Sequence, residues 1–148
     1  MINVDQMEKY YKKLLTEDRE EFLHEKWRKM YEKEAENTIE IDVNLVKKAI
    51  MRMKNGRAAG PGNIPVELIK CGGKKLWEMM TILFNKIING GKIPEEWKIA
   101  IISSIHKKGD KRNCENYRGI SVTGTFSRIY GNILKNLIEA EYEDVEME

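Results

Sequence analysis

The chain of 148 residues has few of the side chains that build disulfide frameworks or metal centres. It contains two cysteines and two histidines. Cys71 and Cys114 have no CxxC spacing, and His24 and His106 lie far apart in the sequence. These features exclude a disulfide framework and argue against a zinc site. We therefore expect free thiols in a reducing compartment, the nucleus or the cytoplasm, and no secretion.

Long apolar runs and a strong overall charge are also missing. No stretch approaches the ~20 apolar residues that a membrane-spanning helix needs, and the first residues lack the apolar core of a signal peptide. We therefore expect no membrane partner. The net charge is only +2, from 26 basic and 24 acidic residues. A uniformly polycationic protein is thereby excluded.

The known phosphate-cradling motifs are absent too. Residues 55–65, NGRAAGPGNIP, hold three glycines and two prolines, which predicts a loop between helices. No Gly-Lys-Ser/Thr follows at P-loop spacing, and the loop does not match GxGxxG. Its glycines would still permit close approach by a ligand strand. The adjacent acids Glu143 and Asp144, which follow Tyr142, lie in an acidic terminal run, which indicates a solvated helix end rather than a metal site.

What the chain does have is a dense basic segment in a defined place. Residues 106–118, HKKGDKRNCENYR, follow the apolar, β-branched run of residues 97–105. This pattern predicts a strand, a turn, and a second strand over residues 117–122. The segment holds two acids against five basic residues: Lys107, Lys108, Lys111, Arg112 and Arg118. Such a turn suits the phosphates of a nucleotide or a nucleic acid. A lysine-rich turn that protects a sheet edge from aggregation fits equally well.

Helical periodicity covers most of the remaining chain. Residues 4–36 predict two helices with a break that begins near Thr16. Further helices are predicted over residues 43–54, capped by Asp42, and over residues 66–71. Others are predicted from Leu76 to Ile87, and after a cap at Thr123 or Thr125. The fold class is therefore α+β: mostly helical, with one small antiparallel β-hairpin.

The last predicted helix has a broader apolar face than a lone hairpin can cover. A two-stranded hairpin is marginally stable by itself and needs a partner surface. We therefore expect the chain to be part of something larger, or to self-associate through an exposed C-terminal helix. The residues expected to make that contact are Leu134, Leu137 and Ile138.

Four blocks together resemble the N-terminal part of reverse transcriptases from non-LTR (LINE-type) retrotransposons. They are residues 49–65 (AIMRMKNGRAAGPGNIP), 83–110 (LFNKIINGGKIPEEWKIAIISSIHKKGD), 116–121 (NYRGIS) and 128–139 (RIYGNILKNLIE). Each block alone is a weak signal, whereas four in order at natural spacing are specific. The resemblance covers roughly residues 39–148.

The resemblance implies a domain organisation and an activity. Residues 1–38 would form an N-terminal helical segment. Residues 39–148 would form a partial reverse transcriptase domain, comprising the fingers subdomain of a right-hand polymerase and the start of the palm. The implied partners are an RNA template or DNA, and a deoxynucleoside triphosphate.

Two sets of residues take implied roles in such a polymerase. The hairpin would lie over the incoming nucleotide, where fixed cations hold the triphosphate or the template backbone. The residues of this first set are Lys107, Lys108, Arg112 and Arg118. The loop of residues 55–65 would lie near the template strand. The residues of this second set are Arg57, Gly60, Pro61 and Ile64.

The chain departs from the family pattern at two positions and in one larger respect. Gly62 stands where the family has Asp, which would loosen the loop, and Gly119 stands where it has Pro, which would remove a rigid turn. The family uses two metal ions held by palm aspartates. None of the five aspartates here has that context. We therefore expect Mg²⁺ only in the full-length family, and no catalytic or metal-binding residue in this chain.

Three functions remain open on the sequence. The first is a reverse transcriptase fragment, truncated before the catalytic aspartates and inactive alone. The second is a remnant that binds nucleic acid weakly. The third is a helical protein-interaction module whose contact surface is the last helix.

Overall fold

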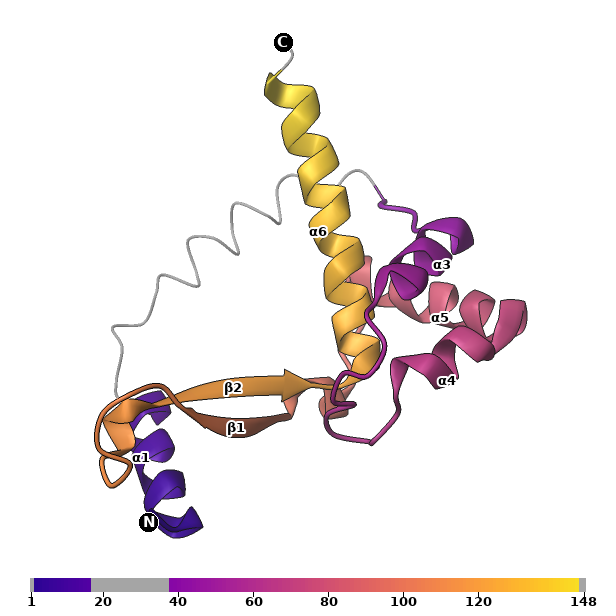
Figure 1. Ribbon diagram of the computed structural model, residues 1–148. Coiled ribbons are helices and arrows are strands. Elements are labelled where there is room, and N and C mark those ends of the chain that lie inside the picture. Colours follow the sequence, from indigo (N-terminus) through magenta and orange to yellow (C-terminus); the bar gives the residue numbers. More distant parts are fainter. Residues whose placement is uncertain (1, 17–37, 147–148) are drawn as a thin grey trace. The chain divides into compact units, whose positions relative to one another are not determined.

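A computed structural model describes residues 2–16 and 38–146 (Figure 1). These residues fall into two compact units, which we describe one at a time. One unit combines the chain up to Thr38 with Ile102–Ser121. The other combines Ile39–Ile101 with Val122–Glu148. The assignment of residues 1–38 and 39–148 to separate domains stays a prediction.

Helices make up most of the described residues. In chain order the elements are α1 (Val4–Thr16), α3 (Val43–Arg52), α4 (Val66–Cys71), α5 (Gly73–Ile88), the 3-10 helix η1 (Glu95–Lys98), β1 (Ala100–His106), the 3-10 helix η2 (Cys114–Asn116), β2 (Tyr117–Thr123) and α6 (Thr125–Glu146). β1 and β2 pair in a two-stranded sheet. The predicted α+β class, mostly helical with one antiparallel hairpin, is confirmed. The second predicted N-terminal helix falls on residues 17–37, outside the described residues.

The second unit has an apolar core shared by α3, α4, α5 and α6. Its buried residues are Ile41, Val46, Ala49, Ile50, Ile69, Met80, Phe84, Ile129 and Ile133. Beside them Tyr130 packs against Phe84 and Trp97, with ring centroids 5.4 and 5.6 Å away. Burial raises the pKa of the Tyr130 phenol. No described helix is both long enough and apolar enough to cross a membrane.

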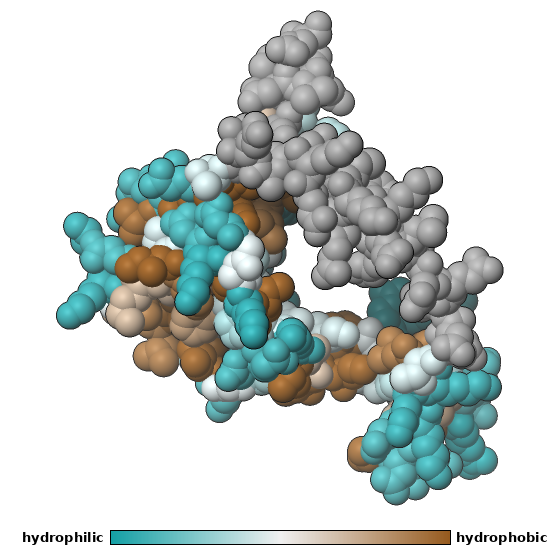
Figure 2. Space-filling view, turned by 180° about the vertical axis from the view of Figure 1, so that it is seen from behind, coloured by the Kyte–Doolittle hydropathy of each residue, from teal (hydrophilic) through white to brown (hydrophobic). Residues whose placement is uncertain are grey.

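The apolar face of α6 is largely covered within its own unit. Ile129 and Ile133 are fully buried, and Leu137 packs against the core. Of the residues expected to mediate self-association, only Ile138 is exposed, at 53%. The expectation of a broadly exposed C-terminal helix is therefore wrong, because α3 and α5 already occupy that face. Apolar side chains do reach the surface elsewhere on this unit, over α4 and α5 (brown in Figure 2). These include Leu68, Met79 and Ile82.

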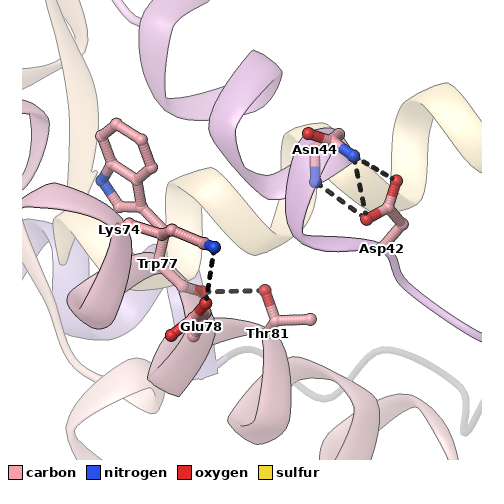
Figure 3. Close-up of polar contacts among 6 residues, drawn as sticks. All are labelled: Asp42, Asn44, Lys74, Trp77, Glu78 and Thr81. Atoms are coloured by element: carbon pink, nitrogen blue, oxygen red, sulfur yellow. Dashed lines mark hydrogen bonds and ion pairs between the residues drawn. The ribbon is translucent and has the colours of Figure 1, made fainter.

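α3 begins at the predicted cap. The Asp42 carboxylate accepts the Asn44 backbone N–H at 3.0 Å and the Asn44 side-chain amide at 3.1 Å (Figure 3). The backbone hydrogen bond lowers the pKa of Asp42. The helix ends at Arg52, two residues before the predicted end. Met53 is already extended, and its carbonyl accepts the Lys70 ammonium at 2.7 Å.

The cap predicted for the last helix is wrong. Thr123 belongs to β2, and Thr125 is the first residue of α6. The Thr125 hydroxyl donates to the Ile64 carbonyl at 2.5 Å and lies 3.3 Å from the Ala59 carbonyl. The hydroxyl therefore holds a distant loop instead of satisfying a helix N–H. No pattern along the chain reveals this partner, which lies about 60 residues away.

Two asparagines of the second unit fix the segment that leads into α3. The Asn85 amide oxygen accepts the Ile41 N–H at 2.7 Å, and the Asn85 nitrogen donates to the Ile41 carbonyl at 2.8 Å. One turn on, at the C-cap of α5, Asn89 donates to the Ile39 carbonyl at 3.0 Å. These bonds satisfy main-chain groups that a helix or a sheet would otherwise satisfy.

In the first unit α1 packs against the turn end of the hairpin (Figure 1). Tyr11 is the buried residue of α1. A Cβ atom at Gly119 would lie 2.8 Å from the Tyr11 ring and 3.2 Å from Ile102. Gly119 is thus a notch within β2 that admits the tyrosine. Gly119 lies in an extended strand of this chain, and the loss of a rigid turn relative to the family stays a prediction.

Candidate phosphate-binding surface

The basic turn, residues 106–118, is held by polar side chains of its own. Asp110 accepts the Arg112 backbone N–H at 2.9 Å, and Asn113 accepts the Glu115 N–H at 3.0 Å. The Asn116 amide donates across the turn to the Asp110 carbonyl at 2.9 Å. These short-range bonds imitate backbone turns and are typical of Asp and Asn. They order the main chain without using any basic side chain.

Further contacts close the turn where it meets the strands. The Lys107 N–H donates to the Asn116 carbonyl at 2.8 Å. The His106 and Tyr117 rings meet edge to face, with centroids 5.1 Å apart. Gly109 has φ +85°, a conformation that favours glycine. The pairing sets the register of the hairpin, with residues 106 and 117 opposite one another.

The five basic side chains of the turn are all exposed. They are Lys107, Lys108, Lys111, Arg112 and Arg118. Within the described part of the chain, none of them forms an ion pair with an acid within 4.0 Å. The Asp110 carboxylate, which lies within the turn, accepts the main-chain N–H of Arg112. Like charges gathered on one short segment repel, and a bound polyanion would relieve that repulsion.

Arg118 differs from the other four because it lies within a strand. Side chains alternate between the two faces of a strand, and Tyr117 and Gly119 are its neighbours in β2. Gly119 faces Tyr11 of α1. Arg118 therefore lies on the opposite face, which α1 leaves open. On that face the register places it across from Ile105, which is 52% exposed.

The loop of residues 55–65 belongs to the second unit and is tied down at its start. Gly56 donates its N–H to the Glu67 carboxylate at 2.6 Å. This bond lowers the pKa of Glu67. The Lys70 ammonium donates to the Asn55 side chain at 2.7 Å. The first residues of the loop are therefore held against α4 by hydrogen bonds.

The same loop is tied further along to the start of α6. Arg128 donates to the Ala58 carbonyl at 2.8 Å, in addition to the bond between Thr125 and Ile64. Gly60, with φ +73°, lies so close to Thr123 and Gly124 that a Cβ atom would overlap the Thr123 carbonyl. The sequence predicted that a ligand strand could approach the loop closely at its glycines. At Gly60 that space is occupied by the main chain of Thr123 and Gly124. Gly62, at φ +85°, has open space around it.

The structure brings each predicted set together but in different units. The four predicted triphosphate contacts share the hairpin of the first unit. The predicted template contacts share one loop of the second, where Arg57 and Ile64 are exposed and Gly60 and Pro61 are half-buried. The binding roles of both sets stay predictions. Sequence reasoning gave Tyr11 and Asn85 no role, although residues 83–85 lie within one of the blocks that carry the resemblance.

Within residues 2–16 and 38–146, no three His, Cys, Asp or Glu side chains gather closely enough to hold a metal ion. The Mg²⁺ that the resemblance implies for the full-length family therefore has no fitting donor set among these residues.

Three proteins of Drosophila melanogaster are similar to this chain. A 115 kDa protein of the type-1 retrotransposable element R1DM is 30% identical over 100 residues, which is 66% of this chain. The probable RNA-directed DNA polymerase of the transposon X-element is 31% identical over 90 residues, or 60% of the chain. The corresponding polymerase of the transposon BS is 26% identical over 97 residues, or 65% of the chain. No family model matches the chain.

These matches bear out the resemblance read from the four sequence blocks. The matched segments span about a tenth of the length of the curated relatives, between 10% and 11% of each. Over up to two thirds of its own residues, the chain is related to the RNA-directed DNA polymerases of LINE-type retrotransposons.

Proposed function

We propose that this chain supplies phosphate contacts to an RNA-directed DNA polymerase, as a fingers-type element. In this proposal Lys107, Lys108, Arg112 and Arg118 hold the phosphates of an incoming nucleotide or of the template. Arg57 and Ile64 lie at the exposed face of a loop beside the template. The described residues bind and orient, and we assign no catalytic step to them.

The observation that carries this proposal is the ordered, unneutralised basic turn. A surface turn that only protects a sheet edge needs lysines but does not need a fixed main chain. Here Asp110, Asn113 and Asn116 fix the main chain and leave the cations exposed. A site that is ordered before its ligand arrives loses less conformational entropy on binding. Because the chain is related to RNA-directed DNA polymerases, whose substrates carry phosphates, we infer that the bound anion is a phosphate.

The proposal is tested by the salt dependence of RNA binding. A fluorescent oligouridylate is titrated with the chain at several salt concentrations, and the slope of log K against log salt is measured. Three to four phosphate contacts on a single strand predict a slope of about −2 to −3. Replacing Lys107, Lys108, Arg112 and Arg118 by Ala should flatten that slope by about 0.7 per contact. A parallel titration with a deoxynucleoside triphosphate compares the two phosphate sources.

The matched control removes the same number of charges elsewhere. Lys74, Lys75, Lys92 and Lys98 are exposed lysines of the second unit. Their replacement by Ala changes the net charge equally, so a loss seen only in the turn variant locates the contact. Equal losses of affinity in the two variants would show that RNA binding depends only on the net charge, and would refute the proposal.

The helical protein-interaction module is less well supported. It relied on an exposed apolar face on the last helix, and α3 and α5 cover most of that face. Self-association remains a proposal that depends on the exposed Ile138. Sedimentation of the wild type and of Ile138→Glu checks it: identical monomeric profiles would exclude this contact.

A further inference from the structure

A polar groove lies between α3 and α6, within the second unit and apart from the basic turn. Its floor includes Ala49, which is 98% buried. Its rim combines two cations with two side-chain amides: Arg52, Lys135, Asn132 and Asn136. The hollow measures about 210 Å³. Neither the sequence motifs nor the similarity to polymerases assigns a role to this place.

The helical spacing explains why these groups meet. Asn132, Lys135 and Asn136 stand at i, i+3 and i+4 and therefore share one face of α6. Arg52 is the last residue of α3, which packs against α6. Lys48, four residues earlier, is exposed on the same side of α3. Two elements thus present hydrogen-bond donors to one hollow.

The chemistry of the rim favours an anion. Arginine and lysine only donate, and each asparagine amide adds two further N–H groups. Among the residues that the structure describes, the Asn132 amide donates to the Met53 sulfur, a weak acceptor that a charged oxygen would displace. The lining itself contains no carboxylate. An oxyanion can therefore accept a hydrogen bond from each of the four side chains.

The size of the groove limits what that anion can be. Small-molecule sites usually measure ~300–1,000 Å³ and enclose most of the ligand. This hollow is smaller and lies open beside exposed cations. It suits one or two phosphodiester groups of a chain that passes across it, rather than a whole nucleotide held inside.

A local ion pair competes for one of the cations. Lys135 lies 3.4 Å from Glu139 in an exposed i,i+4 pair. Pairs of this kind are worth little in water. The pair therefore lowers affinity for an anion modestly, and a phosphodiester can replace the carboxylate. The same geometry occurs between Lys74 and Glu78 on α5, outside the groove (Figure 3), which provides a matched control.

We propose that Arg52, Asn132, Lys135 and Asn136 form a second binding site for the sugar-phosphate backbone of single-stranded nucleic acid. The inference depends on the proposed function, since the relation to RNA-directed DNA polymerases is what names nucleic acid as the source of phosphate. It adds a contact surface on the helical unit, separate from the hairpin.

The test combines RNA titrations with a direct view of the groove. Arg52→Ala with Lys135→Ala should flatten the salt slope of oligouridylate binding by about 1.4, from two lost contacts. Lys74→Ala with Lys75→Ala removes the same charge and should leave the slope unchanged. Glu139→Gln should tighten binding severalfold at low salt, whereas Glu78→Gln should not. Thermal unfolding monitors the fold of each variant.

Nuclear magnetic resonance of the asparagine side-chain amides reports on the site even where a variant folds poorly. RNA should shift the amide resonances of Asn132 and Asn136 in the wild type, while inorganic phosphate at equal ionic strength should shift them far less. Equal shifts with inorganic phosphate would make a single anion the ligand and refute the backbone site. Amide resonances that RNA does not shift would also overturn the proposal. So would an Arg52→Ala, Lys135→Ala variant with the same salt slope as the Lys74→Ala, Lys75→Ala variant.

The two proposals fail in different ways. If only the groove variant loses affinity, the second site stands and the proposed role of the basic turn falls. If only the turn variant loses affinity, the proposed function stands and the second site is refuted.

Discussion

Single polar side chains position whole segments of this molecule. Thr125 holds residues 59 and 64, Asn85 holds Ile41, and Asp110 shapes the basic turn from within. Each bond satisfies a main-chain group that lies outside helix and sheet. Because such groups are costly to leave unpaired when buried, the loss of one side chain should destabilise a segment far from it in sequence.

The first prediction concerns the hydroxyl of Thr125. Thr125→Val keeps the shape but leaves the Ile64 and Ala59 carbonyls without their donor. We expect a loss of about 1–3 kcal/mol in the free energy of unfolding, measured by urea denaturation. Thr125→Ser should retain most of the stability.

Thr81→Val serves as its control. The Thr81 hydroxyl donates at 2.7 Å to Trp77 of its own helix (Figure 3). This bond merely duplicates a contact of the helix backbone, so we expect a change below about 0.5 kcal/mol. Similar losses for Thr81→Val and Thr125→Val would contradict the role given to Thr125.

The second prediction concerns the charge of Asp42. Its pKa is lowered from 3.8 by the Asn44 N–H, so the cap stabilises the fold above pH 3.8 and loses that effect as the pH falls through the folded-state pKa. The melting temperatures of the wild type and of Asp42→Ala should therefore differ most near neutral pH and converge in acid. A difference that stays constant from pH 7 to pH 2 would show that charge is irrelevant to the cap.

At the scale of elements, the hairpin and the first helix support each other. A hairpin alone is marginally stable, and Tyr11 of α1 contacts the face that contains Gly119. The arrangement depends on a small residue in one element and a large ring in another. Enlarging Gly119 or truncating Tyr11 should therefore destabilise both α1 and the hairpin.

The third prediction tests this notch. Gly119→Val places a side chain against the Tyr11 ring, and we expect destabilisation of about 1–3 kcal/mol despite the better strand propensity of valine. Hydrogen exchange in α1 and β2 should quicken. Tyr11→Ala combined with Gly119→Val should cost less than the sum of the single changes.

A variant of Tyr11 checks the same contact, and Gly131 provides a contrasting glycine outside it. Within the described residues the Tyr11 hydroxyl is buried without a hydrogen-bond partner, so Tyr11→Phe should be neutral or stabilising. Gly131, on α6, has open space around its Cα, so Gly131→Ala should stabilise that helix by about 0.5–1 kcal/mol. A Gly119→Val variant as stable as the wild type would show that the ring does not need the notch.

Local sequence signals predicted the elements better than their partners. The Asp42 cap and the two strands follow from neighbouring residues, and the structure confirms them. Thr125, Gly119 and Asn85 could not be interpreted in this way. The partner of each lies between 44 and 108 residues away along the chain, and only the folded structure brings it near.

For the candidate site, the basic turn could be predicted because its charges are contiguous in sequence. The groove between α3 and α6 could not, because Arg52 and Lys135 are ordinary helix residues until the two helices pack. Exposure of the cations on the turn also required the structure, since Asp110 and Glu115 lie close enough in sequence to have neutralised them.

At the scale of the whole molecule, the small net charge hides an uneven distribution. Residues 139–148 hold six acids and no basic residue, so the preceding residues hold 18 acids against 26 basic residues, a net charge of +8. A nucleic acid that approaches the chain therefore meets opposing fields. At low salt these fields act over about 10–30 Å.

The fourth prediction uses this asymmetry. Replacing Glu141, Glu143, Asp144, Glu146 and Glu148 by their amides raises the formal net charge from +2 to +7. We expect oligouridylate binding to tighten by about tenfold at low salt, and the gain to vanish near 1 M salt, where the Debye length is ~3 Å. A gain that persists at high salt would indicate a direct contact rather than long-range repulsion.

The clamp that Asn85 makes has an evolutionary consequence. It recognises only peptide atoms of Ile41, and Asn89 likewise recognises only the carbonyl of residue 39, whose side chain is 48% exposed. Substitutions at position 39 should therefore have little effect on stability. At position 85 even aspartate, which cannot donate a hydrogen bond, and glutamine, whose side chain is one carbon longer, should destabilise the fold. In a library of random variants, position 39 should vary widely, whereas the buried Ile41 and the asparagine at position 85 should be retained.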